Sequence, residues 1–253
     1  DNWATTLAGP GNKKVMWRPG GGYYNDQQTG GLVGKSHDIG RQVAVLPKEV
    51  AIIQSEIECF PYQRLHKAAN MIALEACSHI AAGCTGTAFN VFTMYNEPLV
   101  EYELLISKLH KTRPFYNKMV NALARTEVTG IQTFWNKSSA VTGNLFSGHW
   151  LSMGNPVQNH VLYDIGLPAT YSNKKPAVTL LAKDNVFALS RQEIKQLLST
   201  AVYMDAETLQ QLNDLGFGDM TGFKVARYNE DNRIEKFTHH PINKGFEGRE
   251  RDN

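Results

Sequence analysis

The chain has 253 residues, 42% of them hydrophobic and 20% charged, and its 26 basic and 24 acidic residues give a formal net charge of +2. This composition is typical of a folded globular protein and excludes a disordered or fibrous one. The charges are interspersed without a basic block, so we expect neither a nucleic-acid partner nor an anionic membrane surface.

The sequence shows no sign of membrane insertion. No run of about 18 apolar residues occurs, and the start at Asp1 lacks the charged-then-apolar plan of a signal peptide. We therefore expect a soluble chain without a membrane partner. A leader that was removed, or that lies upstream, would make the protein periplasmic or secreted.

The cysteines and histidines argue against a cofactor or a metal. No C-x-x-C pair occurs, which favours buried free thiols at Cys59, Cys77 and Cys84. His239 and His240 have no acid or thiol at metal-ligand spacing, which favours a surface pair. We expect no metal site and no cofactor.

The first half of the chain predicts alternating strands and helices. Apolar runs predict strands at 15–17, 50–57 and 87–92. The run at 50–57 lacks clean alternation, which is typical of a parallel strand covered on both faces. Apolar spacing predicts helices at 32–43, ended by Pro47, at 63–82, closed by Gly83, at 99–110, and from Arg113-Pro114 to about 124.

This alternation predicts the fold class. Strands separated by helices of such length pair in parallel through right-handed crossovers. The first 126 residues therefore predict an α/β fold. It is either part of a β/α barrel or an open doubly wound sheet.

A second α/β part is expected from residue 127 onward. Further strands are predicted at 128–135, 177–181, 201–204 and 223–227, and a stretch rich in Gly, Asn and Ser precedes Pro156. Ser190-x-x-Glu193 forms a capping box that opens a helix to Leu198. Asp205 caps a helix that Gly216 ends. We place the two domains at 1–126 and 127–253.

Two carboxylates mark the end of the strand at 50–57. Strand side chains alternate, so Glu56 and Glu58 point to one side, roughly 6 to 7 Å apart, together with Gln54. Acids on an apolar strand are costly to bury unless a polar cavity receives them. In β/α folds the carboxyl ends of the strands form that cavity, which favours a functional site. The alternative is a solvated pair held by neighbouring Arg or Lys.

A third acid follows the strand at 87–92. Asn96-Glu97-Pro98 is similar to the Asn-Glu-Pro in which many barrel glycosidases keep their acid/base glutamate. In those enzymes the acid/base strand precedes the nucleophile strand, whereas Glu97 follows Glu58. Pro and acids also favour the start of a helix, so Glu97 is a weaker catalytic candidate.

Two glycine-rich segments are less informative. Gly31–Ser36 is similar to a phosphate-binding loop, but its required first glycine falls on Thr29 and no strand precedes it. Gly20–Gly22 lacks the spacing of a dinucleotide-binding turn, and we interpret it as a loop at the border of a pocket. Aromatic residues near the predicted strand ends offer faces on which sugar rings stack.

With these residues in place, the chain resembles family-42-like glycoside hydrolases of the β-galactosidase type. These join a β/α (TIM-type) barrel to a flavodoxin/amidotransferase-like trimerisation domain. Residues 53–61 resemble the seventh barrel strand, whose terminal glutamate is followed by proline; that spacing selects Glu58 as the nucleophile. Residues 177–216 are similar to the trimerisation domain, including Leu189-Ser190 before a helix and the turn at 197–199.

The resemblance implies retaining hydrolysis of a carbohydrate by a homo-oligomer. Glu58 would attack the anomeric carbon, and Glu56 would be a neighbouring ligand or competitor for that role. The family's acid/base glutamate lies on strand four, which is not among these residues, so we expect the C-terminal portion of a larger enzyme. Residues expected to bind substrate are Trp17, Arg18, Tyr23, Tyr24, Gln54 and Asn90.

Two alternatives remain. The chain could be a non-catalytic carbohydrate-binding or oligomerisation module in which the acids are structural. It could also be an independent two-lobed α/β enzyme that acts through Glu97 or Asp184.

Overall fold

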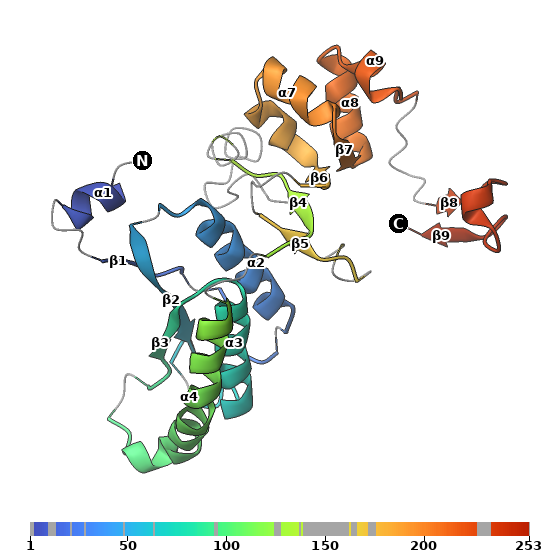
Figure 1. Ribbon diagram of the computed structural model, residues 1–253. Helices are drawn as coiled ribbons and strands as arrows, with labels where there is room; N and C mark the ends of the chain where they lie inside the picture. Colours follow the sequence, from blue (N-terminus) through green and yellow to red (C-terminus); the bar gives the residue numbers. More distant parts are fainter. Residues whose placement is uncertain are drawn as a thin grey trace. The chain divides into compact units, whose positions relative to one another are not determined.

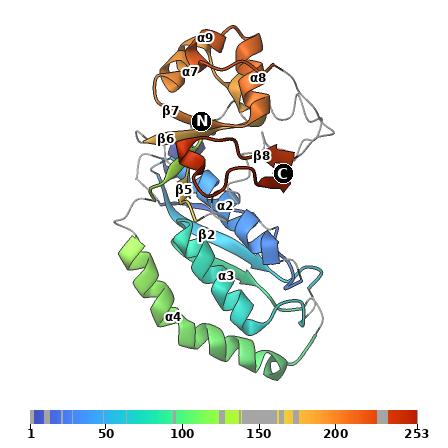
Figure 2. The ribbon, with the colours of Figure 1, turned by 90° about the vertical axis from the view of Figure 1, so that its right-hand side faces the viewer.

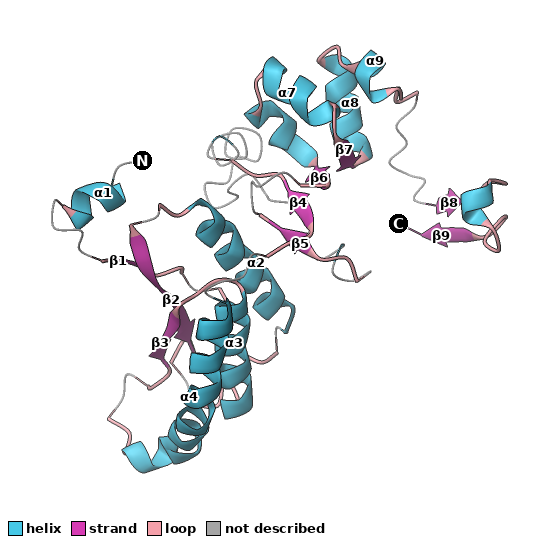
Figure 3. Cartoon of the chain, viewed as in Figure 1, coloured by secondary structure: helices cyan, strands magenta, loops and turns pink. Residues whose placement is uncertain are grey.

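The computed structural model describes residues 3–9, 14–20, 22–27, 29–47, 49–62, 64–93, 96–123, 128–136, 138, 162, 166–171, 176–226 and 234–252. The chain divides into two compact units, Asp1–Met204 and Asp205–Asn253. Its helices and parallel strands give an α/β fold (Figures 1 and 3). The predicted domain boundary near residue 126 stays a prediction.

The first sheet contains three parallel strands in the order in which they occur along the chain. They are β1 (Val15–Trp17), β2 (Val50–Glu58) and β3 (Gly86–Asn90). Glu56 pairs with Ala88 and Glu58 with Asn90 in the β2–β3 register. The connections are α2 (Thr29–Val45) and α3 (Ala69–Ala81), and α1 (Trp3–Ala8) precedes β1. The predicted strands and their parallel pairing are thereby confirmed.

Burial along β2 alternates, so its two faces have different roles. Ile53, Ser55 and Ile57 are buried, whereas the side chains between them are only half-buried. Ile57 packs in a core cluster with Ile72 and Ile80 of α3. Full burial of each such isoleucine side chain stabilises the fold by roughly 1.5 to 3 kcal/mol relative to its exposure to water. The prediction of a strand covered on both faces is therefore wrong for the described residues, because the acids and Gln54 occupy the second face.

The helices after β2 and β3 differ from their predicted bounds. α3 begins at Ala69, six residues later than predicted, because residues 64–67 form turns. After η1 (Leu99–Tyr102), α4 (Glu103–Leu123) runs without interruption through Pro114. Proline has no N–H to donate to the preceding turn, and α4 bends about midway in Figure 2. The sequence predicts a new helix at this proline, but one bent helix forms.

The second sheet is also parallel, with strand order β5-β4-β6-β7. Its strands are β4 (Ile131–Thr133), β5 (Ala169–Thr170), β6 (Val178–Leu181) and β7 (Ala201–Met204). η2 (Lys183–Ala188) and α7 (Arg191–Leu198) connect β6 to β7. The capping box predicted at Ser190 and Glu193 is present. The predicted Gly-, Asn- and Ser-rich stretch lies mostly outside the described residues.

The unit Asp205–Asn253 contains α8 (Ala206–Asp214), α9 (Gly218–Thr221), η3 (Pro241–Asn243) and an antiparallel pair, β8 (Ile234–Lys236) and β9 (Glu250–Asp252). Asp205 caps α8 as predicted. The predicted strand at 223–227 is absent from the described residues 223–226. Asn213 bonds to Phe223 O and Val225 N instead, at 3.0 Å each, and so takes the backbone groups that a strand would pair. Among the described helices, none has the length and apolar character to cross a bilayer.

Candidate functional site

Polar side chains form a row across the carboxyl ends of the three strands in the first sheet. Arg18 follows β1, Glu56 and Glu58 end β2, and Asn90 ends β3. Arg18 Nη1 lies 2.8 Å from Glu56 Oε1, and Asn90 Nδ2 lies 3.4 Å from Glu58 Oε1. Four residues that the sequence assigned to the site are thus brought together by parallel pairing.

The two carboxylates of this row have different partners. Glu56 is 15% exposed and ion-paired with Arg18, which is 55% exposed, and its backbone N–H donates to Pro19 O at 3.3 Å. Within the described part of the chain, the Glu58 carboxylate pairs with no cation. A carboxylate without an ion-pair partner stays available to a ligand, so Glu58 is the better candidate for a reacting group.

Gln54 lies on the same face, one step before the acids. It pairs with Gly86 in the β2–β3 register, and its side chain would contact a Cβ built on Gly86 at 3.7 Å. The half-buried amide thus lies over the start of β3. It extends the polar row away from the strand ends.

Aromatic rings border the end of β2. Phe60 is 52% exposed and contacts Tyr24 and Tyr62 edge-on, with ring centroids 5.8 and 5.6 Å apart. Tyr62 has a φ of 66°, a conformation that costs a non-glycine residue about 1 to 3 kcal/mol. Its N–H donates to Cys59 O at 2.6 Å. Such strain often accompanies a binding site.

Three other predicted site residues lie in different surroundings. Trp17 Nε1 donates to Gln42 of α2 at 3.1 Å, and its ring stacks obliquely on Trp3 of α1. Glu97 accepts a 2.8 Å hydrogen bond from Tyr102 of η1. Tyr23 is fully buried. These contacts tie the three side chains to helices and loops and do not place them in the polar row.

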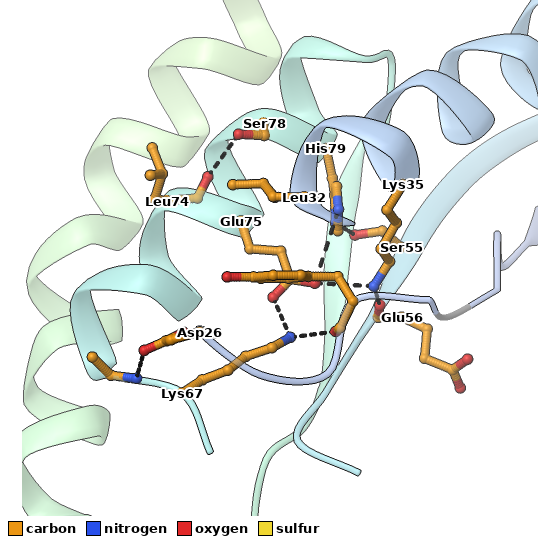
Figure 4. A network of polar contacts seen from close by, with 12 residues as sticks. Asp26, Leu32, Lys35, Ser55, Glu56, Lys67, Leu74, Glu75, Ser78 and His79 are labelled. Carbon is orange, nitrogen blue, oxygen red and sulfur yellow. Dashed lines mark hydrogen bonds and ion pairs between the residues drawn. The ribbon is translucent and has the colours of Figure 1, made fainter. Parts of the chain in front are cut away.

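Behind β2 lies a buried ionic network, which Figure 4 shows from close by. Glu75 of α3 accepts from Lys35 of α2 at 3.0 Å and from Lys67 at 2.6 Å, and all three residues are almost completely buried. Lys35 also donates to the Glu56 backbone oxygen, whereas the Glu56 carboxylate points away from the network. The network is therefore attached to the strand that carries the site.

Lys67 connects this network to the loop after β1. Its ammonium donates to Tyr23 O at 2.6 Å and lies 4.4 Å from the centre of the Tyr23 ring. Burial lowers the pKa of Lys67, and the Glu75 carboxylate opposes that shift. Burial, together with the negative charges of Asp26 and Glu75, raises the pKa of Tyr23 to about 12. The phenol therefore stays protonated at neutral pH.

His79 lies beside the same carboxylate. Its Nδ1 is 2.9 Å from Ser55 Oγ, and its Nε2 is 3.9 Å from Glu75 Oε1. Burial, followed by the charges of Lys35 and Lys67, lowers the pKa of His79 to about 3. The imidazole is therefore neutral at physiological pH.

The thiol next to Glu58 is not suited to nucleophilic chemistry. Cys59 is buried, and its pKa is raised to about 11 by burial, against the lowering effect of Lys67. A thiol in such surroundings stays protonated and inert. Within the described residues, no group of three or more His, Cys, Asp and Glu side chains could hold a metal ion.

Sequence reasoning missed the network behind β2. A signal was available, because Glu75 and His79 lie four residues apart within the apolar pattern of the helix that ends at Gly83. Charged residues on an apolar helix face are rarely buried without a partner. Their partners, Lys35 and Lys67, could not be identified from spacing, since they come from other segments.

Comparisons with known proteins add no information about identity. No family model matches the chain, and no curated protein or solved structure matches it. The geometry of the polar row is therefore what supports a function.

Proposed function

We propose that this chain belongs to a retaining glycoside hydrolase of the β-galactosidase type, in which Glu58 is the nucleophile. One observation carries the proposal. Glu58 is an acid without a cation partner among the described residues, at the carboxyl end of a parallel strand, next to Asn90 and beside the ion-paired Glu56. Parallel α/β folds place their active sites at such strand ends.

Each neighbour of Glu58 has a role in this proposal. Asn90 donates to the Glu58 carboxylate and orients it toward the anomeric carbon. Glu56, neutralised by Arg18, binds sugar hydroxyls instead of reacting. The exposed Phe60 ring offers an apolar surface on which a sugar ring stacks.

Retaining chemistry also requires an acid/base carboxylate about 5 to 5.5 Å from the nucleophile. The family resemblance assigns this group to an earlier barrel strand. Glu97 is less suited to the role, because its carboxylate accepts from Tyr102 at the start of the helical segment after β3. Glu58 displaces the leaving-group oxygen from the anomeric carbon and forms the glycosyl ester, while the acid/base carboxylate protonates the departing oxygen. Water that the same carboxylate deprotonates then attacks the anomeric carbon and releases Glu58.

The two sheets support the finer fold that belongs to this proposal. Strand order β1-β2-β3 follows the chain, and α2 contacts α3, as expected where successive crossovers keep helices on one face of a barrel. In the second, all-parallel sheet the first strand, β4, lies between β5 and β6, as the first strand does in the order of flavodoxin-like sheets. In the proposal this second sheet belongs to a domain through which copies of the chain associate.

The proposal is tested by turnover of an aryl β-galactoside by the protein that contains this chain. Glu58→Gln should reduce kcat by roughly a thousandfold or more, because the amide cannot form the glycosyl ester. Glu103→Gln, which changes an exposed acid on α4, is the matched control and should retain activity. Unchanged turnover by Glu58→Gln would contradict the proposal.

A rescue experiment separates a nucleophile from an acid/base. With azide, Glu58→Ala should regain activity and release the α-glycosyl azide, because azide enters from the face that Glu58 occupied. Release of the β-glycosyl azide would assign Glu58 the acid/base role instead. If Glu58→Gln changes self-association or stability without any loss of turnover, the non-catalytic module becomes the better interpretation.

A further inference from the structure

Two loops border the proposed site, and Asp26 joins them through its backbone N–H and its carboxylate. Residues 22–27 follow β1, and residues 64–68 lead from β2 into α3. The Asp26 N–H donates to His66 O at 3.0 Å, and the Ala68 N–H donates to Asp26 Oδ2 at 2.7 Å. Asp26 therefore holds the first loop against the start of α3.

Lys67 joins the same loops from the buried side. Its ammonium bonds to Tyr23 O and to Glu75, and its own side chain is fully buried. A buried ammonium is stable only with its carboxylate and hydrogen-bond partners in place. The backbone of Tyr23 is thereby attached to Lys67.

Glu75 connects the contact between Lys67 and Tyr23 to β2, the strand that carries Glu56 and Glu58. One carboxylate oxygen accepts from Lys67, and the other accepts from Lys35, which in turn bonds to Glu56 O. The same buried carboxylate thus connects the loop after β1 with the backbone just before Glu58. Figure 4 shows Lys35 and Lys67 converging on Glu75 between α3 and β2.

We infer that Lys35, Lys67 and Glu75 are positioning residues for the proposed sugar site. They hold the loop that carries Tyr24 against Phe60, and they fix the backbone from which Glu58 projects. None of the three reaches the exposed face of β2, because all are almost completely buried. The inference rests on the proposed function, since positioning matters only if Glu58 reacts there.

The first arm of the test measures loop order and needs no activity. In Lys67→Met, hydrogen exchange at the amides of Asp26 and Ala68 should accelerate by at least about tenfold, while exchange in α7 stays unchanged. Lys67→Gln, whose neutral amide can still donate hydrogen bonds, is a milder variant that should loosen the same loop if Lys67→Met fails to fold. Asp38→Ala removes a carboxylate that pairs with Arg41 within α2, and it should leave these amides unaffected.

The second arm measures turnover of the aryl galactoside. In either loop variant kcat should fall by at least about tenfold without a matching rise in KM, because misplacing a reacting group by about 1 Å can cost a hundredfold. Faster loop exchange with unchanged kcat would overturn the inference and leave the role of Glu58 intact. Exchange that rises equally throughout α3 and α7 would show a purely structural role and would also overturn it.

If Glu58→Gln leaves turnover unchanged, the proposed function fails separately. The positioning role then has no site to serve, whatever the exchange rates show. Glu58→Gln itself should not change loop exchange, because Glu58 lies outside the buried network. The two failures are therefore distinguishable. Unchanged turnover in Glu58→Gln contradicts the proposed function, whereas unchanged turnover in the loop variants contradicts only the positioning role.

Discussion

Single residues on β2 serve two opposite purposes. Ser55 is buried and contacts His79, whereas its neighbour Glu56 turns its carboxylate to the other face and pairs with Arg18. Successive side chains of a strand point to opposite faces, and this alone places the two side chains on different sides of the sheet. As a result, a hydroxyl that contacts the buried network and a carboxylate at the site lie one residue apart.

The buried imidazole of His79 predicts a dependence of stability on pH. The pKa of His79 is about 3 in the folded protein, against about 6.5 for an unfolded histidine. Between these values only the unfolded chain binds the proton. The contribution of His79 to the free energy of unfolding is therefore complete above pH 6.5, and this contribution falls by about 1.4 kcal/mol per pH unit as the pH decreases toward 3.

Urea unfolding at several pH values between 7 and 4 measures this dependence. In His79→Gln the free energy of unfolding should depend less steeply on pH, because glutamine does not titrate. His110→Gln changes an exposed histidine and should retain the slope of the parent protein. Equal slopes in His79→Gln and the parent protein would show that His79 is not the group responsible.

At the scale of elements, local patterns predicted most strands and helices. β-branched residues and apolar spacing identified β2 and α3, and side-chain caps identified the starts of α7 and α8. Two of the predictions that were wrong share a cause. The start of α3 and the segment at 223–226 depend on hydrogen bonds to other segments, which spacing does not contain.

The glycine after α3 allows an element-scale test. Gly83 has a φ of 112°, and a Cβ there would lie 2.8 Å from Val43 Cγ1. Gly83→Ala should lower the free energy of unfolding by about 1 to 3 kcal/mol. Gly40→Ala, inside α2 with its nearest neighbour 3.9 Å away, should instead raise it by about 0.5 to 1 kcal/mol. Chemical unfolding measures both variants. Changes in the free energy of unfolding that have the same sign and size in the two variants would contradict this account.

The start of α7 allows a second test at this scale. Ser190 Oγ accepts from the Glu193 N–H, so Ser190→Ala should reduce the stability by about 1 kcal/mol. Ser78 lies inside α3, where its hydroxyl bonds back to Leu74 O and contributes no cap. Ser78→Ala should be neutral or slightly stabilising. A larger loss in Ser78→Ala than in Ser190→Ala, measured by thermal unfolding, would contradict this account of the caps.

For the whole molecule, topology decides which residues meet. The sequence alone placed Glu56 and Glu58 on one face, and parallel pairing then brought Arg18 and Asn90 beside them. The buried network was beyond prediction, because Lys35 and Glu75 are separated by 40 residues and meet only after α2 and α3 pack. Local patterns identified the acids of the site but not the residues that support them.

The central claim is that Glu58 becomes covalently attached to a sugar. Its most direct test treats the protein with a dinitrophenyl galactoside in which fluorine replaces the hydroxyl next to the anomeric carbon. The leaving group departs without a proton, and the fluorine slows release of the glycosyl ester, so the ester accumulates. Peptide mass spectrometry should find one fluoro-galactosyl group on Glu58, absent from Glu58→Gln and retained in Glu103→Gln. A label on Glu56 or Glu97, or no label at all, would contradict the account.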